Sequence, residues 1–414
     1  MVGMLEPTTI TNSTAAVRPL RRRTLLTAAL ASGLGLAAAT PVAAAHRRIT
    51  GGYVLPAPSG PARLGTVALH LRDTSRTDPW VPSRPVREIM VQVWYPARTV
   101  RGHLPEPWLS PGAVPHFAEA FGLPAGRIRD TRTHGRTGAP VERRPGGHPV
   151  LLYSPGLGGD RGTGTVLVED LVSHGYIVVT IDHTHDASEV EFPDGRVEVA
   201  AVPPDLTDEI LLQAADVRAA DTRFVLDQLA ALDAGRNPDA GRRRLPDGLR
   251  GAFDLDRIGM FGHSLGGSTA AAVMNQDPRL KAGADLDGTL LGPAAVAGST
   301  RPFLLFGSDH GPDAEDPTWN AFWAAQRGWK RQLRLRDSVH GSFTDGVAFY
   351  PQAAAEIGLT PQQLAEMVGA LAPQRSIVIQ RSYLRAFFDQ HLRCRGGRLL
   401  AAPDPRYPEI EFVR

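Results

Sequence analysis

Short apolar runs alternate with longer stretches of helical periodicity from residue 149 to the C-terminus. The runs predict strands over 149–153, 176–181, 257–261, 282–286, 302–306 and 332–335. The stretches between and after them predict helices over 163–174, 207–232, 265–274, 318–327, 361–371 and 377–392. This alternation is typical of a parallel sheet with crossover helices.

Two apolar runs precede this region. Residues 66–71 alternate in polarity and predict an edge strand, whereas residues 89–95 have the β-branched and aromatic content of a strand that Pro96 stops. The polar segment 97–146, with its Gly and Pro, is assigned no element. The expected fold class is α/β, with a mostly parallel central sheet and helices on both faces. In such open sheets functional residues gather at the carboxyl ends of the strands.

Composition narrows the class of protein. The 414 residues are 42% apolar and 21% charged, values that exclude a disordered chain. The 45 basic residues nearly balance the 43 acidic ones, so a nucleic-acid partner is not implied. A lone cysteine, Cys394, allows neither an internal disulfide nor a thiolate metal site.

Residues 1–45 have the three parts of a secretory signal. A basic head ends in three arginines at 21–23, an uncharged Leu- and Ala-rich stretch follows, and small residues close it at 43–45. Two arginines followed by Thr-Leu-Leu resemble the twin-arginine export signal. We expect cleavage near Ala45, a secreted product, extracellular or periplasmic, and a single catalytic domain over 46–414. A membrane anchor is the alternative interpretation of this stretch.

The strongest chemical signal is the sequence Gly-His-Ser-Leu-Gly at 262–266. It lies between a predicted strand and a predicted helix, which is the context of a nucleophile elbow. The serine of an elbow sits on a strained turn, and its flanking glycines avoid collisions with the adjoining strand and helix. We therefore expect Ser264 to be a nucleophile, in preference to a serine of a Gly-rich loop.

A nucleophilic serine needs a histidine to take its proton and a carboxylate to orient that histidine. After an elbow the expected chain order is serine, acid, histidine. His340 follows the last predicted parallel strand and is preferred to His310, which follows the preceding one. Asp287 and Asp309, at the ends of two successive strands, remain nearly equal candidates for the acid. Asp285 lies on the same side of its strand as Asp287 and is expected to support it.

Two backbone amides are expected to stabilise a developing oxyanion. Leu265, directly after the nucleophile, supplies the first. The second fits Leu157, in the glycine-rich loop that follows the strand 149–153. The alternative, a phosphate-binding loop, lacks the Lys-Ser ending of such loops.

Three polar side chains follow the strand 176–181: His183, His185 and Asp186. They are of types that bind metals, but no further partner upstream or downstream is evident at metal-ligand spacing. We therefore expect structural or pocket-rim roles for them and no metal site.

The sequence resembles the platelet-activating factor acetylhydrolase family, whose α/β-hydrolase fold is similar to that of secreted bacterial lipases. The resemblance spans roughly 64–350 and rests on fragments in one order: 91–96, 153–158, 173–176, 262–267, 286–287 and 338–340. It implies that the acid is Asp287 rather than Asp309, that the oxyanion donors are Leu157 and Leu265, and that no metal or organic cofactor is needed. At Pro155 the animal members carry histidine.

The expected function is a secreted serine ester hydrolase that forms an acyl-enzyme on Ser264, with Asp287 and His340 completing the catalytic set. The expected substrate is a small-molecule or lipid ester, either phospholipid-like or with a short acyl group. Transient contact with a lipid surface is compatible with this expectation. The alternatives are a lipase or polyester hydrolase for long acyl chains or polymers, and a non-catalytic protein that kept the fold.

Overall fold

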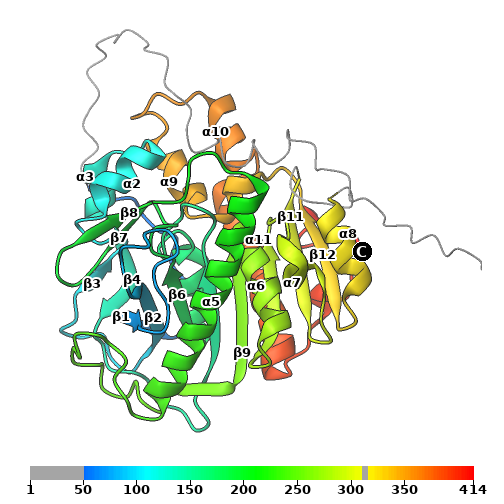
Figure 1. Cartoon of the computed structure of the whole chain (residues 1–414). Coiled ribbons are helices and arrows are strands. Elements are labelled where there is room, and N and C mark those ends of the chain that lie inside the picture. The colour runs from blue at the N-terminus through cyan, green and yellow to red at the C-terminus, as the bar shows by residue number, and fades with distance from the viewer. Residues whose placement is uncertain (1–50, 310–315) are drawn as a thin grey trace, which may run out of the picture. The chain divides into compact units, whose positions relative to one another are not determined.

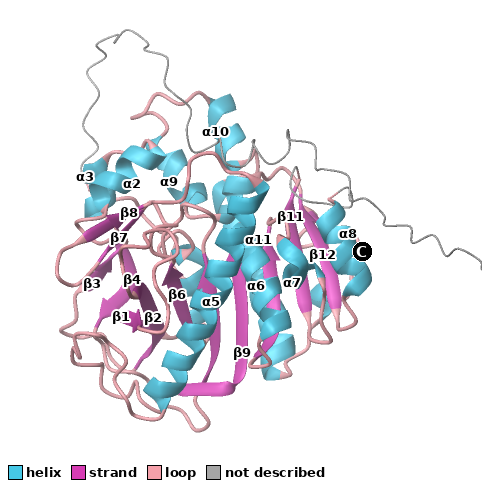
Figure 2. Ribbon diagram, viewed as in Figure 1, coloured by secondary structure: helices cyan, strands magenta, loops and turns pink. Residues whose placement is uncertain are grey.

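The computed structural model describes residues 51–309 and 316–414. Within them eleven strands form one sheet, in the order β13-β12-β11-β10-β9-β5-β6-β2-β1-β4-β3 (Figures 1 and 2). These strands are β1 (Arg63–Asp73), β2 (Arg87–Ala97), β3 (Pro105–Pro107), β4 (Arg132–Thr137), β5 (His148–Ser154), β6 (Ile177–Asp182), β9 (Phe253–His263), β10 (Leu280–Leu286), β11 (Phe303–Ser308), β12 (Lys330–Leu335) and β13 (Ile410–Phe412). β7 (Glu189–Glu191) and β8 (Val197–Val199) pair separately.

The centre of the sheet is parallel, as predicted. β5, β6 and β9 to β12 run in one direction, whereas β2 is antiparallel to β6 and β13 is antiparallel to β12. The eight strands predicted from apolar runs are all present, but the predicted edge strand, β1, is not at an edge, because it lies between β2 and β4. The expected α/β fold class is therefore confirmed.

Helices cover both faces of the sheet (Figures 1 and 2). Residues of one face pack in a single apolar cluster with those of α5 (Asp208–Asp233), α6 (Leu265–Gln276), α7 (Gly292–Val296) and α8 (Pro317–Ala325). Residues of the other face pack with those of α4 (Thr165–Ser173) and α11 (Pro373–Arg393). Along β5, Val150 and Leu152 belong to the first cluster and Leu151 and Tyr153 to the second, as the two-residue period of a strand requires.

The segment without predicted elements, 97–146, contains β3, β4, α2 (Val114–Phe121) and α3 (Ala125–Asp130). Residues of α2 and α3 share an apolar cluster with α9 (Gly346–Ala353) and α10 (Pro361–Val368), which lie at the top of Figure 1. Trp108 holds this cluster together, because its ring meets Phe117 and Phe349 edge-on at centroid distances of 5.0 and 4.7 Å. These elements are short and depend on contacts between distant segments, so local periodicity did not reveal them.

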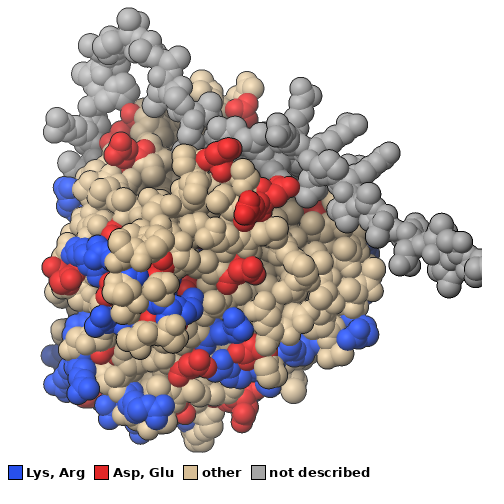
Figure 3. All heavy atoms as spheres, in the orientation of Figure 1, with Lys and Arg blue, Asp and Glu red and all other residues tan. Residues whose placement is uncertain are grey.

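Two of the sequence-based expectations concern residues outside the described part of the chain. The export signal at 1–45 and the alternative base His310 both lie there. Among the described residues, no helix is both long and apolar enough to span a bilayer. On the face drawn in Figure 3, acidic and basic side chains are interspersed, and the Lys and Arg side chains lie mainly in its lower half.

Candidate active site

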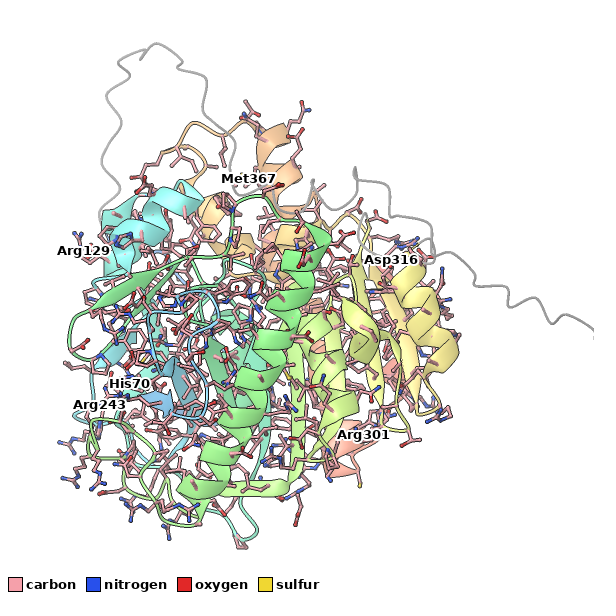
Figure 4. All side chains as sticks on the ribbon, viewed as in Figure 1. His70, Arg129, Arg243, Arg301, Asp316 and Met367 are labelled. Atoms are coloured by element: carbon pink, nitrogen blue, oxygen red, sulfur yellow. The ribbon has the colours of Figure 1, made fainter. Side chains whose placement is uncertain are left out.

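Ser264 occupies the turn between β9 and α6. Its backbone has φ 55° and ψ −123°, a positive φ that is rare for a residue with a side chain and that stores strain. Its amide donates a hydrogen bond of 2.9 Å to the Leu286 carbonyl at the end of β10. Arg301 contacts the Met274 carbonyl in the last turn of α6 and lies at the lower end of Figure 4. Ser264, the N-cap residue of α6, is therefore at the opposite end of that helix.

Glycines allow three chain segments to meet at this turn. A Cβ atom at Gly266 would lie 1.9 Å from the Ser154 carbonyl oxygen, and one at Gly262 would lie 2.2 Å from the Gly266 carbonyl carbon. A Cβ at Gly156 would lie 3.4 Å from Ser264 Cβ, so the loop after β5 packs directly on the serine. The glycines of the motif are thus required by close packing.

Asp287 and His340 form a hydrogen-bonded pair. His340 Nδ1 lies 2.8 Å from Asp287 Oδ2, and Ser308 donates to the same carboxylate from its backbone amide at 2.6 Å and its hydroxyl at 3.1 Å. Burial alone would raise the pKa of Asp287, but the hydrogen bonds from His340 and Ser308 outweigh it and hold this pKa below its usual range. The acid is therefore held ionised beside the imidazole.

The alternative acids lie elsewhere. Asp309 Oδ2 accepts from the Asp337 amide at 3.1 Å and makes no contact with His340 among the described residues. Asp285, fully buried, accepts from the Gly288 amide at 2.9 Å and so supports the turn that carries Asp287. The structure thus brings Asp287, and not Asp309, to the histidine.

His263, the second residue of the motif, is a neighbour of the pair that sequence reasoning did not single out. Its Nε2 donates a 3.0 Å hydrogen bond to the His340 carbonyl, and the two rings lie 4.3 Å apart between centroids. Burial, and then the charge of His340, lower the pKa of His263 to about 3. This contact ties the η1 segment (His340–Phe343), which carries His340, to the residue directly before Ser264.

The two predicted oxyanion donors flank Ser264. Leu265 is the first residue of α6, and Leu157 lies in the loop whose Gly156 packs on the serine. Within the described residues neither amide donates a hydrogen bond to a protein acceptor. The Leu157 and Leu265 side chains belong to a small apolar cluster with Trp80, Leu291, Ala214 and Ala215. The site therefore combines free amide donors with an apolar wall.

The residues after β6 make buried hydrogen bonds within the fold. His183 lies 3.1 Å from Asp221 through Nδ1 and 3.0 Å from the Ser154 hydroxyl through Nε2. His185 contacts Asp78, and Asp186 pairs with the buried Arg218 of α5. Arg218 also reaches the loop that carries Leu157, a contact that sequence analysis missed. Among residues 51–309 and 316–414, no group of three His, Cys, Asp or Glu side chains is placed to hold a metal ion.

An acidic cavity of about 110 Å³ lies at the carboxyl ends of β5 and β6, apart from the three proposed catalytic side chains. Its only basic lining residue is Arg161, against the carboxyl groups of Glu106, Asp160, Asp182, Glu189 and Glu191. Glu189 is 1% exposed, and neither of its carboxyl oxygens has a hydrogen-bond partner within the described residues. Burial, and then the charges of Asp160 and Asp182, raise the pKa of Glu189 well above its usual range.

The substitution Glu189→Gln is expected to raise the Tm at pH 8 and to leave it nearly unchanged at pH 4. Above about pH 4.3 the unfolded chain ionises Glu189 while the folded chain keeps the proton, so the wild type loses stability as pH rises. Glutamine has the same shape and carries no such cost. Thermal unfolding of both proteins from pH 4 to 8 measures this, with the exposed Glu119→Gln as control. A Tm difference that does not grow with pH would contradict the prediction.

Comparison with known proteins places the chain in a family. The profile of platelet-activating factor acetylhydrolase, isoform II, matches residues 87–393. The chain belongs to this family. It is 29% identical over 392 residues to a probable 1-alkyl-2-acetylglycerophosphocholine esterase of Arthroderma benhamiae, covering 88% of this chain and 95% of that one. It is 24% identical over 260 residues to platelet-activating factor acetylhydrolase of Canis lupus familiaris, covering 59% and 56% of the two chains.

A solved structure extends the comparison. The ferulic acid esterase of Streptomyces cinnamoneus superposes with a TM-score of 0.72 and 35% identity, over 88% of this chain and 100% of that one. Membership of the platelet-activating factor acetylhydrolase family and this esterase neighbour together make the chain a carboxylic ester hydrolase with the α/β-hydrolase fold. The resemblance noted from the sequence is confirmed.

Proposed function

We propose that the protein is a secreted serine esterase that cleaves short-acyl carboxylic esters, phospholipid-like esters included, through an acyl-enzyme on Ser264. The observation that carries this proposal is the 2.8 Å contact between His340 Nδ1 and Asp287, with His340 tied to the nucleophile elbow through His263. This is the order of groups that activates a serine hydroxyl.

The proposed mechanism assigns one step to each group. Ser264 Oγ attacks the ester carbonyl while His340 takes its proton, and the Leu157 and Leu265 amides donate to the oxygen that becomes negatively charged. His340 then gives the proton to the departing alcohol, which leaves an acyl-enzyme. Water attacks this ester with His340 again as base, and the acid product leaves. Asp287 keeps the imidazole in the required tautomer throughout.

The surface supports a short acyl group over a long one. The apolar wall beside Ser264 is small, and its members are named above. Within 51–309 and 316–414 the exposed large apolar side chains are few and come from separate segments of the chain: Val54, Leu104, Val199, Leu212 and Val378. The similar proteins are named for acetyl and feruloyl esters.

The acyl chain-length profile tests the substrate class. We expect kcat/KM for p-nitrophenyl esters to be highest for acetate or butyrate and to fall by at least about tenfold by dodecanoate, because longer chains outgrow the wall. A 1-alkyl-2-acetylglycerophosphocholine and methyl ferulate extend the series to the relatives' named substrates. A maximum at long chains would favour the lipase or polyester hydrolase instead.

Export is proposed on the sequence pattern of residues 1–45. N-terminal sequencing of protein recovered outside the cytoplasm is expected to begin near His46. An unprocessed N-terminus retained with the membrane would favour the anchor instead.

A further inference from the structure

Arg218 reaches the loop of the proposed oxyanion donor Leu157 from the middle of α5. Its side chain is fully buried, and its five N–H groups all have acceptors. Nε donates to Asp186 Oδ2 at 2.7 Å, and Nη2 to the other oxygen of the same carboxylate. The remaining donors contact the loop after β5: the Ser154 hydroxyl at 3.4 Å, the Pro155 carbonyl, and the Gly156 carbonyl at 3.0 Å.

The Gly156 carbonyl shares a peptide unit with the Leu157 amide. That unit is planar and trans, so its C=O and N–H point in opposite directions. A guanidinium bound to the oxygen therefore fixes the plane and directs the N–H away from Arg218. Because a positive charge at the oxygen end draws electrons along the unit, it also makes the N–H a stronger donor.

The other hydrogen bonds on this loop either share the Gly156 carbonyl or lie beyond it. The Gly156 carbonyl also accepts from the Gly159 amide at 3.0 Å, and the Gly158 carbonyl accepts from the Ser188 hydroxyl at 2.6 Å. The donors of these two bonds are neutral, and neither reaches the Pro155 carbonyl. The Asp186 carboxylate also accepts from the Gly158 amide, at 3.5 Å. Arg218 is thus the charged contact that spans both sides of Gly156, the residue that packs on Ser264.

We propose that Arg218, held by Asp186, is a positioning residue that orients and polarises the Gly156–Leu157 peptide as an oxyanion donor. This inference rests on the proposed function. It predicts a defect in transition-state stabilisation, which lowers kcat and leaves the KM of a small ester nearly unchanged.

The experiment uses the full chain and two variants. Arg218→Met with Asp186→Asn removes both buried charges together, which avoids an unpaired carboxylate and favours folding. Arg218→Lys keeps a charge but has three donors for five acceptors. For p-nitrophenyl acetate we expect kcat to fall by about 10- to 1000-fold in the double variant and by less in the lysine variant, with KM within about threefold.

Two further measurements separate positioning from general damage. A trifluoromethyl ketone forms a tetrahedral oxyanion adduct on an active serine, so its affinity should weaken by the same factor as kcat/KM. Millimolar methylguanidinium should restore part of the kcat of Arg218→Ala, since it can refill the vacated site. The control is Arg76→Met: Arg76 binds Asp221 of α5 at 3.0 Å but does not touch the loop, so kcat should stay near the wild-type value.

The outcomes are distinguishable from failure of the proposed function. If the wild type neither hydrolyses esters nor reacts with a fluorophosphonate at Ser264, the proposed function is wrong. If the wild type does both while a folded Arg218 variant keeps wild-type kcat, only the role of Arg218 is overturned. A loss of kcat without loss of trifluoromethyl ketone affinity and without rescue also overturns it.

Discussion

Replacement of Ser264 with alanine is expected to lower kcat for p-nitrophenyl acetate by about 10⁶-fold. The variant has no hydroxyl to attack the ester carbonyl, so no acyl-enzyme can form. The residual rate should come from the amides of Leu157 and Leu265 and from substrate binding alone. The Tm should stay near that of the wild type, because alanine keeps the Cβ atom and the backbone hydrogen bond to Leu286.

The matched control is Ser382→Ala on α11, whose hydroxyl binds the Val378 carbonyl of its own helix. Its activity should equal that of the wild type. Fluorophosphonate labelling followed by mass spectrometry should find the adduct on the peptide that contains Ser264. An Ser264→Ala protein with wild-type turnover, or an adduct on another serine, would refute the proposed nucleophile.

Replacement of Asp287 with asparagine is expected to lower kcat by about 10⁴-fold. The Ser308 amide donates to one carboxylate oxygen at 2.6 Å, so the asparagine oxygen should take that place. Its NH₂ group would then face His340 Nδ1, which must become an acceptor. The imidazole would then carry its proton on Nε2. Nε2 must be unprotonated to accept the proton of Ser264, so the base would be in the wrong tautomer.

Asp309→Asn is the control that sequence analysis makes necessary. Asp309 accepts from the Asp337 amide, whereas the carboxylate that binds His340 is that of Asp287. Substitution of Asp309 should therefore change kcat by less than about threefold. Parallel kcat measurements on the two variants decide between the acids. Equal losses in both would contradict the assignment of Asp287.

The elbow could be predicted from sequence because its geometry imposes local requirements. Gly262 and Gly266 must lack side chains where β9, α6 and the loop after β5 meet, and this requirement leaves a recognisable spacing. The parallel strands at the centre of the sheet could also be predicted from the sequence. Both faces of the sheet are buried there, so each strand is a nearly continuous apolar run.

The choice between Asp287 and Asp309 could not be made from the spacing of residues. Both follow adjacent parallel strands, and what separates them is the turn: Asp287 has φ 60°, supported by Asp285 beneath it. The resemblance to a family, and not the pattern itself, favoured the residue that contacts His340. The contact of Arg218 with the Gly156 carbonyl could not be predicted either, because 62 residues separate the two along the chain.

The low pKa of His263, about 3, has a consequence for the charge that develops beside it. The imidazole rings of His263 and His340 lie 4.3 Å apart between centroids, tilted by 43°, and would repel each other if both were protonated. Because burial holds the pKa of His263 low, the imidazolium that forms on His340 in the proposed mechanism faces an uncharged neighbour near neutral pH.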